Sequence, residues 1–211
     1  MAKGELIYVG DPMCSWCWFF SPVLDAIRKK YAEQFSFRVV VGGLRPGPQA
    51  VKLDAKLRDF LRHEWTKIQG ATGQPFDTKF LDREGFNYNT HPAACAVVTM
   101  RRLKPEAEFD FFKAVQKAFY ADGVDITQLD NFAAIAAQFG VKGEALVHAM
   151  QTPGAHAATM ADYAEARELG VKGFPTLLLS LGGGHAVLSH GYQPFKALEP
   201  LIDKAIVKTA K

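Results

Sequence analysis

Cysteine is scarce in this sequence, with three residues among 211. An odd and low count argues against a secreted scaffold that is held together by disulfides. It also gives special weight to any closely spaced pair of cysteines. Cys14 and Cys17 form such a pair, with only Ser15 and Trp16 between them.

Dense clusters of one charge and long hydrophobic runs are also absent. The 25 basic and 22 acidic residues give a formal net charge of +3 and are scattered along the chain, so no basic patch predicts nucleic acid or anionic lipid as a partner. No run reaches the roughly 18 apolar residues of a membrane span, and the first residues are too polar for the core of a signal peptide. We therefore expect a cytoplasmic protein with no nucleic acid or membrane partner, and no pattern predicts an oligomeric state.

The N-terminal part of the chain has the pattern of a strand, a helix and a second strand. Residues 6–9 form a short β-prone run, apolar residues recur at helical spacing over 18–31, and a second β-prone run covers 35–41. A unit of this size predicts two parallel strands joined by a crossover helix. The two cysteines lie where the first strand gives way to the helix.

The C-terminal part predicts a helix, a hairpin and a last helix. The hairpin strands at 176–181 and 186–189 are separated by Gly182, Gly183 and Gly184. The chain between the two parts reads as helical and contains no strand pattern. We expect helices at 50–69, 92–104, 106–121, 128–139 and 143–150 in this middle part, and at 155–169 and 194–208 in the C-terminal part. The sequence therefore predicts an α/β unit built from both ends of the chain, interrupted by a helical insertion.

A Cys-x-x-Cys pair at a strand-to-helix turn is typical of redox chemistry. At the N-terminus of a helix, free backbone N–H groups and the helix dipole favour a thiolate, so Cys14 is the expected nucleophile. Cys17 lies three residues on, on the same side of the helix, and is the expected resolving thiol. Because Ser15 and Trp16 supply no imidazolium, we expect a reduction potential between about −270 and −120 mV.

Two other interpretations of the cysteines remain open. Free cysteine is among the most buried residue types, so Cys14 and Cys17 could be ordinary core residues. The pair could also bind zinc together with His91 and Cys95, which lie four residues apart on one helix face. Cys95 stands among alanines and valines, however, which favours an ordinary buried thiol, and we predict no metal and no organic cofactor.

Gly173-Phe174-Pro175-Thr176 precedes the strongest apolar strand of the C-terminal part, and it resembles the cis-proline loop of the thioredoxin superfamily. The resemblance implies that this loop lies beside the cysteine pair and binds substrate, with Phe174 offering main-chain pairing to a peptide.

The segment 11–18, together with the helical insertion, is similar to the FrnE-like cytoplasmic branch of the DsbA family. That resemblance implies an α/β thioredoxin fold with an inserted all-helical domain. The thioredoxin-fold domain would comprise residues 1–48 and 151–211, and the helical insertion residues 49–150.

The same resemblance implies a thiol-disulfide oxidoreductase or protein disulfide isomerase acting on protein or peptide thiols, with glutathione as a candidate redox partner. Ser15 and Trp16 stand where periplasmic DsbA has Pro-His, which leaves isomerase, reductase and mild oxidase open. Glutathione-dependent small-molecule isomerases and transferases share the architecture but keep serine at the reactive position. A non-catalytic adaptor that holds a client, with the cysteines binding zinc or sensing redox state, is the third alternative.

Two neighbours of the cysteines are further candidate site residues. Trp16 lies between them, near the surface, and is expected to contact substrate, whereas Phe19 and Phe20 are expected to pack in the core. Asp11, three residues before Cys14, could relay the proton of Cys17, although an Asp-Pro pair first indicates a turn. The histidines at 91, 148, 156, 185 and 190 are expected to be surface or structural residues.

Overall fold

The computed structural model describes residues 4–181 and 183–209, so Gly182 of the predicted turn lies outside the described residues. Four strands form one sheet, in the spatial order β2 (Ser36–Val41), β1 (Glu5–Gly10), β5 (Thr176–Leu181), β6 (Gly184–His190). β1 and β2 are parallel, whereas β5 runs antiparallel to both β1 and β6. These pairings confirm the predicted parallel pair and the predicted hairpin.

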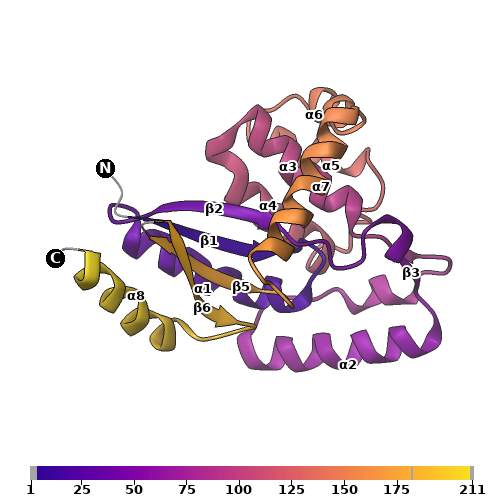
Figure 1. Cartoon of the computed structure of the whole chain (residues 1–211). Helices are drawn as coiled ribbons and strands as arrows, with labels where there is room; N and C mark the ends of the chain where they lie inside the picture. Colours follow the sequence, from indigo (N-terminus) through magenta and orange to yellow (C-terminus); the bar gives the residue numbers. More distant parts are fainter. Residues whose placement is uncertain (1–3, 182, 210–211) are drawn as a thin grey trace.

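Three helices cover the sheet, namely α1 (Ser15–Tyr31), α8 (Phe195–Thr209) and α7 (Pro153–Glu168). Figure 1 shows α1 and α8 below the sheet and α7 above it. Side chains alternate along β1 to fill both interfaces, as they must in a strand buried on two sides. Leu6 and Tyr8 belong to the core beneath the sheet, and Ile7 and Val9 pack on the other face with Ala166 of α7.

The chain between β2 and α7 is mainly helical, as predicted. Its helices are α2 (Ala55–Thr72), α3 (His91–Leu103), α4 (Glu108–Tyr120), α5 (Asn131–Ala137) and α6 (Gly143–Met150). The expectation that it contains no strand is wrong, because β3 (Val51–Lys52) pairs antiparallel with β4 (Asn87–Tyr88). Strands of two residues are too short to show a periodic pattern. The exact domain boundaries at 48–49 and 150–151 stay a prediction.

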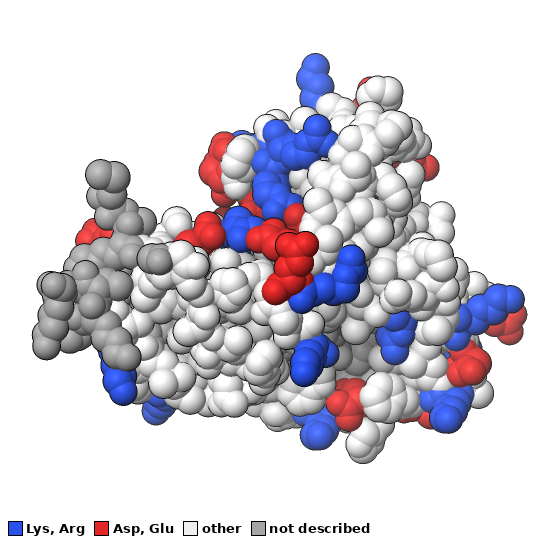
Figure 2. All heavy atoms as spheres, viewed as in Figure 1, with Lys and Arg blue, Asp and Glu red and all other residues white. Residues whose placement is uncertain are grey.

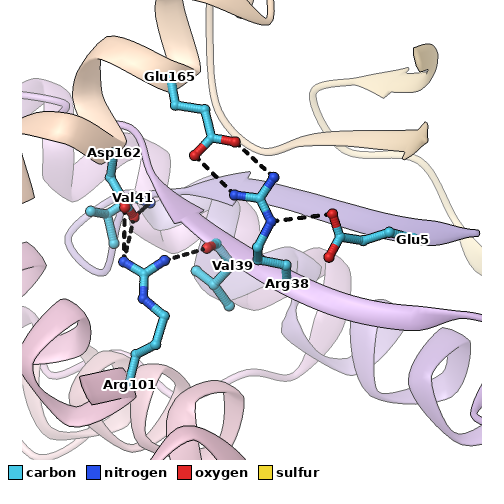
Figure 3. A network of polar contacts seen from close by, with 7 residues as sticks. All are labelled: Glu5, Arg38, Val39, Val41, Arg101, Asp162 and Glu165. Carbon is cyan, nitrogen blue, oxygen red and sulfur yellow. Dashed lines mark hydrogen bonds and ion pairs between the residues drawn. The ribbon is translucent and has the colours of Figure 1, made fainter. Parts of the chain in front are cut away.

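Two charged groups on helices satisfy the backbone of β2, an edge strand of the sheet (Figure 3). The guanidinium of Arg101, on α3, donates to the carbonyl of Val39 at 3.2 Å and to both oxygens of Asp162 at 2.8 Å. The carboxylate of Asp162, on α7, in turn accepts from the amide of Val41 at 3.0 Å. These contacts fix α3 and α7 to the sheet and occupy edge groups that would otherwise be free to pair with another strand.

Charged side chains of both signs gather where α7 meets the edge of the sheet, whereas the surface over the β5–β6 hairpin is largely uncharged (Figure 2). Arg38 of β2 contributes to this charged region by binding Glu165 of α7 at 2.7 Å and Glu5 of β1 at 3.2 Å. None of the helices in the described ranges is both long and apolar enough to cross a bilayer.

A cluster of aromatic rings packs in the core between α2, β4 and α4 and reaches the cysteine loop. Phe119, which is fully buried, contacts five of its rings, including Phe80 and Tyr120 at centroid distances of 4.8 Å. Tyr88 connects the cluster to the loop before α1, because its hydroxyl donates to the carbonyl of Met13 at 2.7 Å. The cluster comprises Trp65, Phe76, Phe80, Phe86, Tyr88, Phe119 and Tyr120.

We predict that Phe119→Ala lowers the free energy of unfolding by about 3–5 kcal/mol, because it removes a ring that its neighbours cannot replace. Urea unfolding followed by circular dichroism measures this loss. Phe60→Ala is the matched control, since Phe60 is 56% exposed and its truncation should change stability by no more than about 0.5 kcal/mol. Equal losses in the two variants would contradict the assignment of the cluster as core.

Candidate active site

Cys14 is the N-cap residue of α1, in an extended conformation. Its amide donates to the carbonyl of Asp11 at 3.0 Å, and its own carbonyl accepts from the amides of Cys17 and Trp18. The Cys14 side chain does not cap the helix. Its sulfur therefore lies at the positive end of the helix dipole, as the sequence predicted, with the thiol free for another partner.

Cys17 lies behind Cys14 and is fully buried, whereas Cys14 is 7% exposed. Both are free thiols. Burial raises the pKa of the Cys17 thiol well above its ordinary value, and the contact with Cys14 acts in the same direction, while hydrogen bonds with the Tyr8 side chain and the Asp11 backbone oppose it. Burial thus favours the protonated form of the Cys17 thiol, and of the two cysteines Cys14 is the one with any exposure to solvent.

The loop before β5 completes the surroundings of Cys14. The peptide bond between Phe174 and Pro175 is cis, and the Cys14 thiol donates to the carbonyl of Phe174 at 3.7 Å. Two further hydrogen bonds hold the loop. The Thr176 hydroxyl donates to the Gly173 carbonyl at 2.8 Å, and the Gly191 amide donates to the Pro175 carbonyl at 2.7 Å. Residues 160 positions apart in the sequence therefore meet at one sulfur atom.

Gly42, just after β2, allows Phe174 to adopt this position. A Cβ atom on Gly42 would lie 1.9 Å from Cε1 of the Phe174 ring, which no side chain tolerates. The ring of Phe174 thus rests directly on the backbone of residue 42. The loops after β1 and β2 and the loop before β5 are packed together at this end of the sheet.

Asp11 links two of these loops through a buried carboxyl group. Its Oδ1 accepts from the amide of Met13 at 2.8 Å, and its Oδ2 accepts from the amide of Leu44 at 2.7 Å. The predicted turn is therefore confirmed. Burial raises the pKa of Asp11 to about 6, although the hydrogen bonds from Leu44 and Met13 oppose the rise. The carboxyl group bonds these loops rather than Cys17, and the proton relay stays a prediction.

The raised pKa of Asp11 predicts a specific pH dependence of stability. Between the ordinary pKa of 3.8 and about 6, the folded protein holds a proton that the unfolded chain has released, so stability falls as the pH rises through this window. The penalty is complete above pH 6 and is on the order of 3 kcal/mol. Asp11→Asn carries no charge and should lack it. We measure the free energy of unfolding of both proteins by urea unfolding from pH 4 to pH 7. The value for the variant minus that for the parent should rise with pH, and a difference that does not change with pH would contradict this.

A hollow of about 210 Å³ opens beside Cys14. Trp16, which is half-buried, forms part of its wall and packs against the ring of Phe19, while Phe19 and Phe20 are buried as predicted. We call this space the central hollow. It is lined by Met13, Cys14, Ser15, Trp16, Leu44, Arg45, Phe60, Leu61, Glu64, Tyr88 and Phe174.

Sequence reasoning missed three residues of this region: Tyr8, Arg45 and Phe60. Tyr8 alternates with Ile7 on β1 and so faces the helix that carries Cys17, which is a signal that strand periodicity could have provided. Arg45 is half-buried, with its guanidinium stacked on the ring of Tyr88 at 5.0 Å. Arg45 and Phe60 come from a loop and from the helical insertion, and no local pattern places either beside the cysteines.

The structure separates the residues of the zinc interpretation. Nδ1 of His91 lies 3.2 Å from the hydroxyl of Tyr163 and its Nε2 lies 3.0 Å from Nδ1 of His156. The sulfur of Cys95 contacts the carbonyl of Met150 at 3.6 Å. Neither side chain faces the Cys14–Cys17 pair, and no three metal-ligating side chains gather anywhere in the described ranges. The other histidines, at 63, 148, 185 and 190, are exposed.

Comparisons with known proteins match most of the chain. The family model described as the DSBA-like thioredoxin domain matches residues 5–203. The structure of a candidate protein disulfide isomerase from Nitrosomonas europaea has 33% sequence identity and a TM-score of 0.90, with 98% of both chains covered. The predicted fold class is therefore confirmed.

More distant matches extend the range of named functions. The cytosolic disulfide reductase DsbM from Pseudomonas aeruginosa, solved with GSH, is 25% identical with a TM-score of 0.77, over 95% of this chain and 98% of that one. The ClpXP adapter protein SpxH of Halalkalibacterium halodurans is 23% identical over 80% of this chain and 56% of its own length. The chain thus spans little more than half the length of this curated relative.

Proposed function

Since the chain belongs to the DsbA-like thioredoxin domain family, we propose that it is a thiol-disulfide oxidoreductase that acts through Cys14 and Cys17. The observation that carries the proposal is the asymmetry of the two thiols. Cys14 reaches the surface at a helix N-terminus and contacts the carbonyl of Phe174, while Cys17 is buried behind it with its pKa raised. A reachable nucleophile backed by a protected second thiol is what two-step disulfide exchange requires.

The reaction begins at the sulfur of Cys14. As a thiolate it attacks one sulfur of a substrate disulfide, and the other substrate sulfur leaves as a thiol after taking up a proton. The product is a mixed disulfide between Cys14 and the substrate. Cys17 then gives up its proton and attacks the sulfur of Cys14, which releases the second substrate thiol and leaves a Cys14–Cys17 disulfide.

Two electrons have passed from the enzyme to the substrate at that point, and an external dithiol or two thiols such as glutathione return them. The cycle requires no metal and no organic cofactor. Run in reverse, the same steps oxidise a substrate dithiol.

We assign substrate binding to the residues around Cys14. Gly173, Phe174, Pro175 and Thr176 form an edge against which an extended peptide can lie, and Trp16 offers an apolar wall in the hollow that Cys14 also lines. The backbone of Phe174 would pair with the substrate main chain. Such pairing is independent of side chains and suits an enzyme that acts on many sequences.

We favour reduction or isomerisation of substrate disulfides, in the cytoplasm, over their formation. Ser15 and Trp16 give no cationic partner to the Cys14 thiolate, so a strongly oxidising disulfide is not expected. The match with DsbM, a cytosolic reductase that was solved with GSH, supports glutathione as the reductant. Arg45 lines the central hollow and supplies a cation for a carboxylate of glutathione.

A redox titration tests the proposal. The protein is equilibrated in glutathione buffers, its free thiols are trapped and counted by mass spectrometry, and insulin reduction driven by dithiothreitol is measured in parallel. We expect Cys14 and Cys17 to titrate together as a two-electron couple between about −270 and −120 mV, with insulin turnover. A protein whose cysteines do not titrate and that does not reduce insulin is not an oxidoreductase.

Client binding without turnover is the second candidate function. The matches to SpxH adapters, at 22–24% identity, favour it. An adaptor would hold its client through the surface around the central hollow and would not need electron transfer. It predicts that client binding persists when Cys14 is replaced, whereas the oxidoreductase proposal predicts that turnover stops.

A further inference from the structure

A second hollow, of about 360 Å³, adjoins the central hollow and is not lined by Phe174. We call it the outer hollow. Arg45 and Phe60 line both spaces and form the boundary between them. The rest of its wall comes from β3 and from the start of α2 and includes Val51, Lys52 and Lys56. A polypeptide whose cysteine reacts with Cys14 can therefore continue past Arg45 into the outer hollow.

The outer hollow is positively charged. Lys52 and Lys56 are exposed, and neither they nor Arg45 form an ion pair with any residue in the described ranges. Asp54 is the one carboxylate on this wall, and its Oδ1 accepts a hydrogen bond from the amide of residue 57 as the cap of α2. Three cations thus face a single carboxylate that is already engaged. The central hollow differs, because its lining contains one cationic side chain, Arg45, and one carboxylate, Glu64.

The outer hollow also offers apolar contact. Phe60 is 56% exposed and Val51 is 39% exposed, and both are among the largest apolar side chains left open to solvent in the described ranges. The aliphatic stems of Lys52 and Lys56 extend this apolar surface while their ammonium groups stay in water. Acidic side chains next to an apolar one match such a surface in both charge and polarity.

We propose that the outer hollow is a specificity subsite for acidic residues of a client polypeptide, a few residues away from the cysteine that reacts with Cys14. The inference rests on the proposed oxidoreductase function and names its substrate class: protein or peptide disulfides with Asp or Glu near one cysteine. Lys52 and Lys56 bind the carboxylates, and Phe60 and Val51 contact the apolar neighbour. A compact thiol such as glutathione is accommodated by the central hollow and does not need this subsite.

Peptide substrates that differ only in charge test the subsite. Each peptide has one internal disulfide. The three residues that follow one of its cysteines are all Glu in the first peptide, all Gln in the second and all Lys in the third. KM and kcat for reduction are measured with the parent protein, with the double variant K52E/K56E, and with the control K67E/K196E. Lys67 and Lys196 are exposed and lie outside both hollows, and Lys67 is on the same helix as Lys56 but about 16 Å further along it.

We expect the parent to have a KM for the Glu peptide about three- to tenfold below that for the Gln peptide, with similar kcat, as for a few partly exposed charge contacts. K52E/K56E should lose this preference or favour the Lys peptide, while K67E/K196E should keep it. Equal KM values for the three peptides, or equal losses in the two double variants, would overturn the proposal.

Binding without chemistry separates this inference from the function on which it rests. The same peptides are made with serine in place of cysteine and a fluorescent label, and their affinity is measured by anisotropy at low and high salt. The subsite predicts the Glu preference here too, and its weakening by salt. A protein that binds the Glu peptide selectively but reduces none of the peptides would refute the oxidoreductase function and support the subsite. A protein that reduces all three peptides equally would support the oxidoreductase function and refute the subsite.

Discussion

Replacement of Cys14 by serine is expected to lower kcat/KM for disulfide reduction by a factor on the order of a thousand or more, because the variant has no nucleophile. A serine hydroxyl does not ionise at neutral pH and forms no bond that a second thiol can later break. Cys17 does not replace it, since that thiol is fully buried and its pKa is raised by burial. Insulin reduction and a small chromogenic disulfide both measure the loss.

The control for Cys14→Ser is Cys95→Ala. Cys95 is the third cysteine, is 4% exposed and contacts the carbonyl of Met150 rather than the pair. Its replacement should leave turnover within about twofold of the parent, since it touches no reacting atom. If Cys95→Ala stops turnover and Cys14→Ser does not, the assignment of the nucleophile is wrong.

Replacement of Cys17 by serine is expected to stop multiple turnover at the mixed disulfide between Cys14 and the substrate, after the first step of the reaction. Cys14 still attacks the substrate, but nothing inside the protein resolves the mixed disulfide. The expected result is a single round of substrate thiol release and a covalent enzyme–substrate adduct, seen by mass spectrometry and removed by dithiothreitol. The adduct persists because no other cysteine in the described ranges can resolve it. Cys95 contacts the carbonyl of Met150 and not the pair.

The same variant separates the two enzyme classes that share this architecture. A glutathione-dependent isomerase or transferase of small molecules needs only one activated group and would retain its activity when Cys17 is replaced. Loss of disulfide turnover together with an accumulated adduct supports dithiol exchange. Retained turnover without an adduct would instead assign the protein to small-molecule chemistry.

Periodicity in the sequence was enough to predict most of the fold. The apolar run at 35–41 and the helical spacing before it predicted the parallel pair, because a buried strand and an amphipathic helix each leave a regular pattern. β3 and β4 were missed, since two residues define no period. Their pairing depends on the helical insertion bringing Val51 and Tyr88 together, and this is a tertiary effect.

The candidate site divides in the same way. Cys14 and Cys17 were singled out because a close pair of thiols at a strand-to-helix turn is a local signal, whereas Pro175 was singled out by the resemblance of its loop to that of the thioredoxin superfamily. Arg45 and Phe60 were not, because an arginine in a loop and an exposed phenylalanine on a helix carry no meaning until α2 is placed over the cysteine loop. The interactions of His91 were also hidden, as its partner His156 is 65 residues away.

The meeting of Cys14 with Phe174, 160 residues later in the chain, has a consequence during synthesis. A ribosome adds about 5–20 residues per second, so roughly 8–30 s pass between the appearance of Cys14 and that of Phe174. During this interval β1 has no β5 to pair with, and Cys17 is not yet enclosed. The nascent chain therefore carries two accessible thiols before it has any means of selecting what they react with, and a reducing environment at the ribosome would keep them intact until the sheet closes.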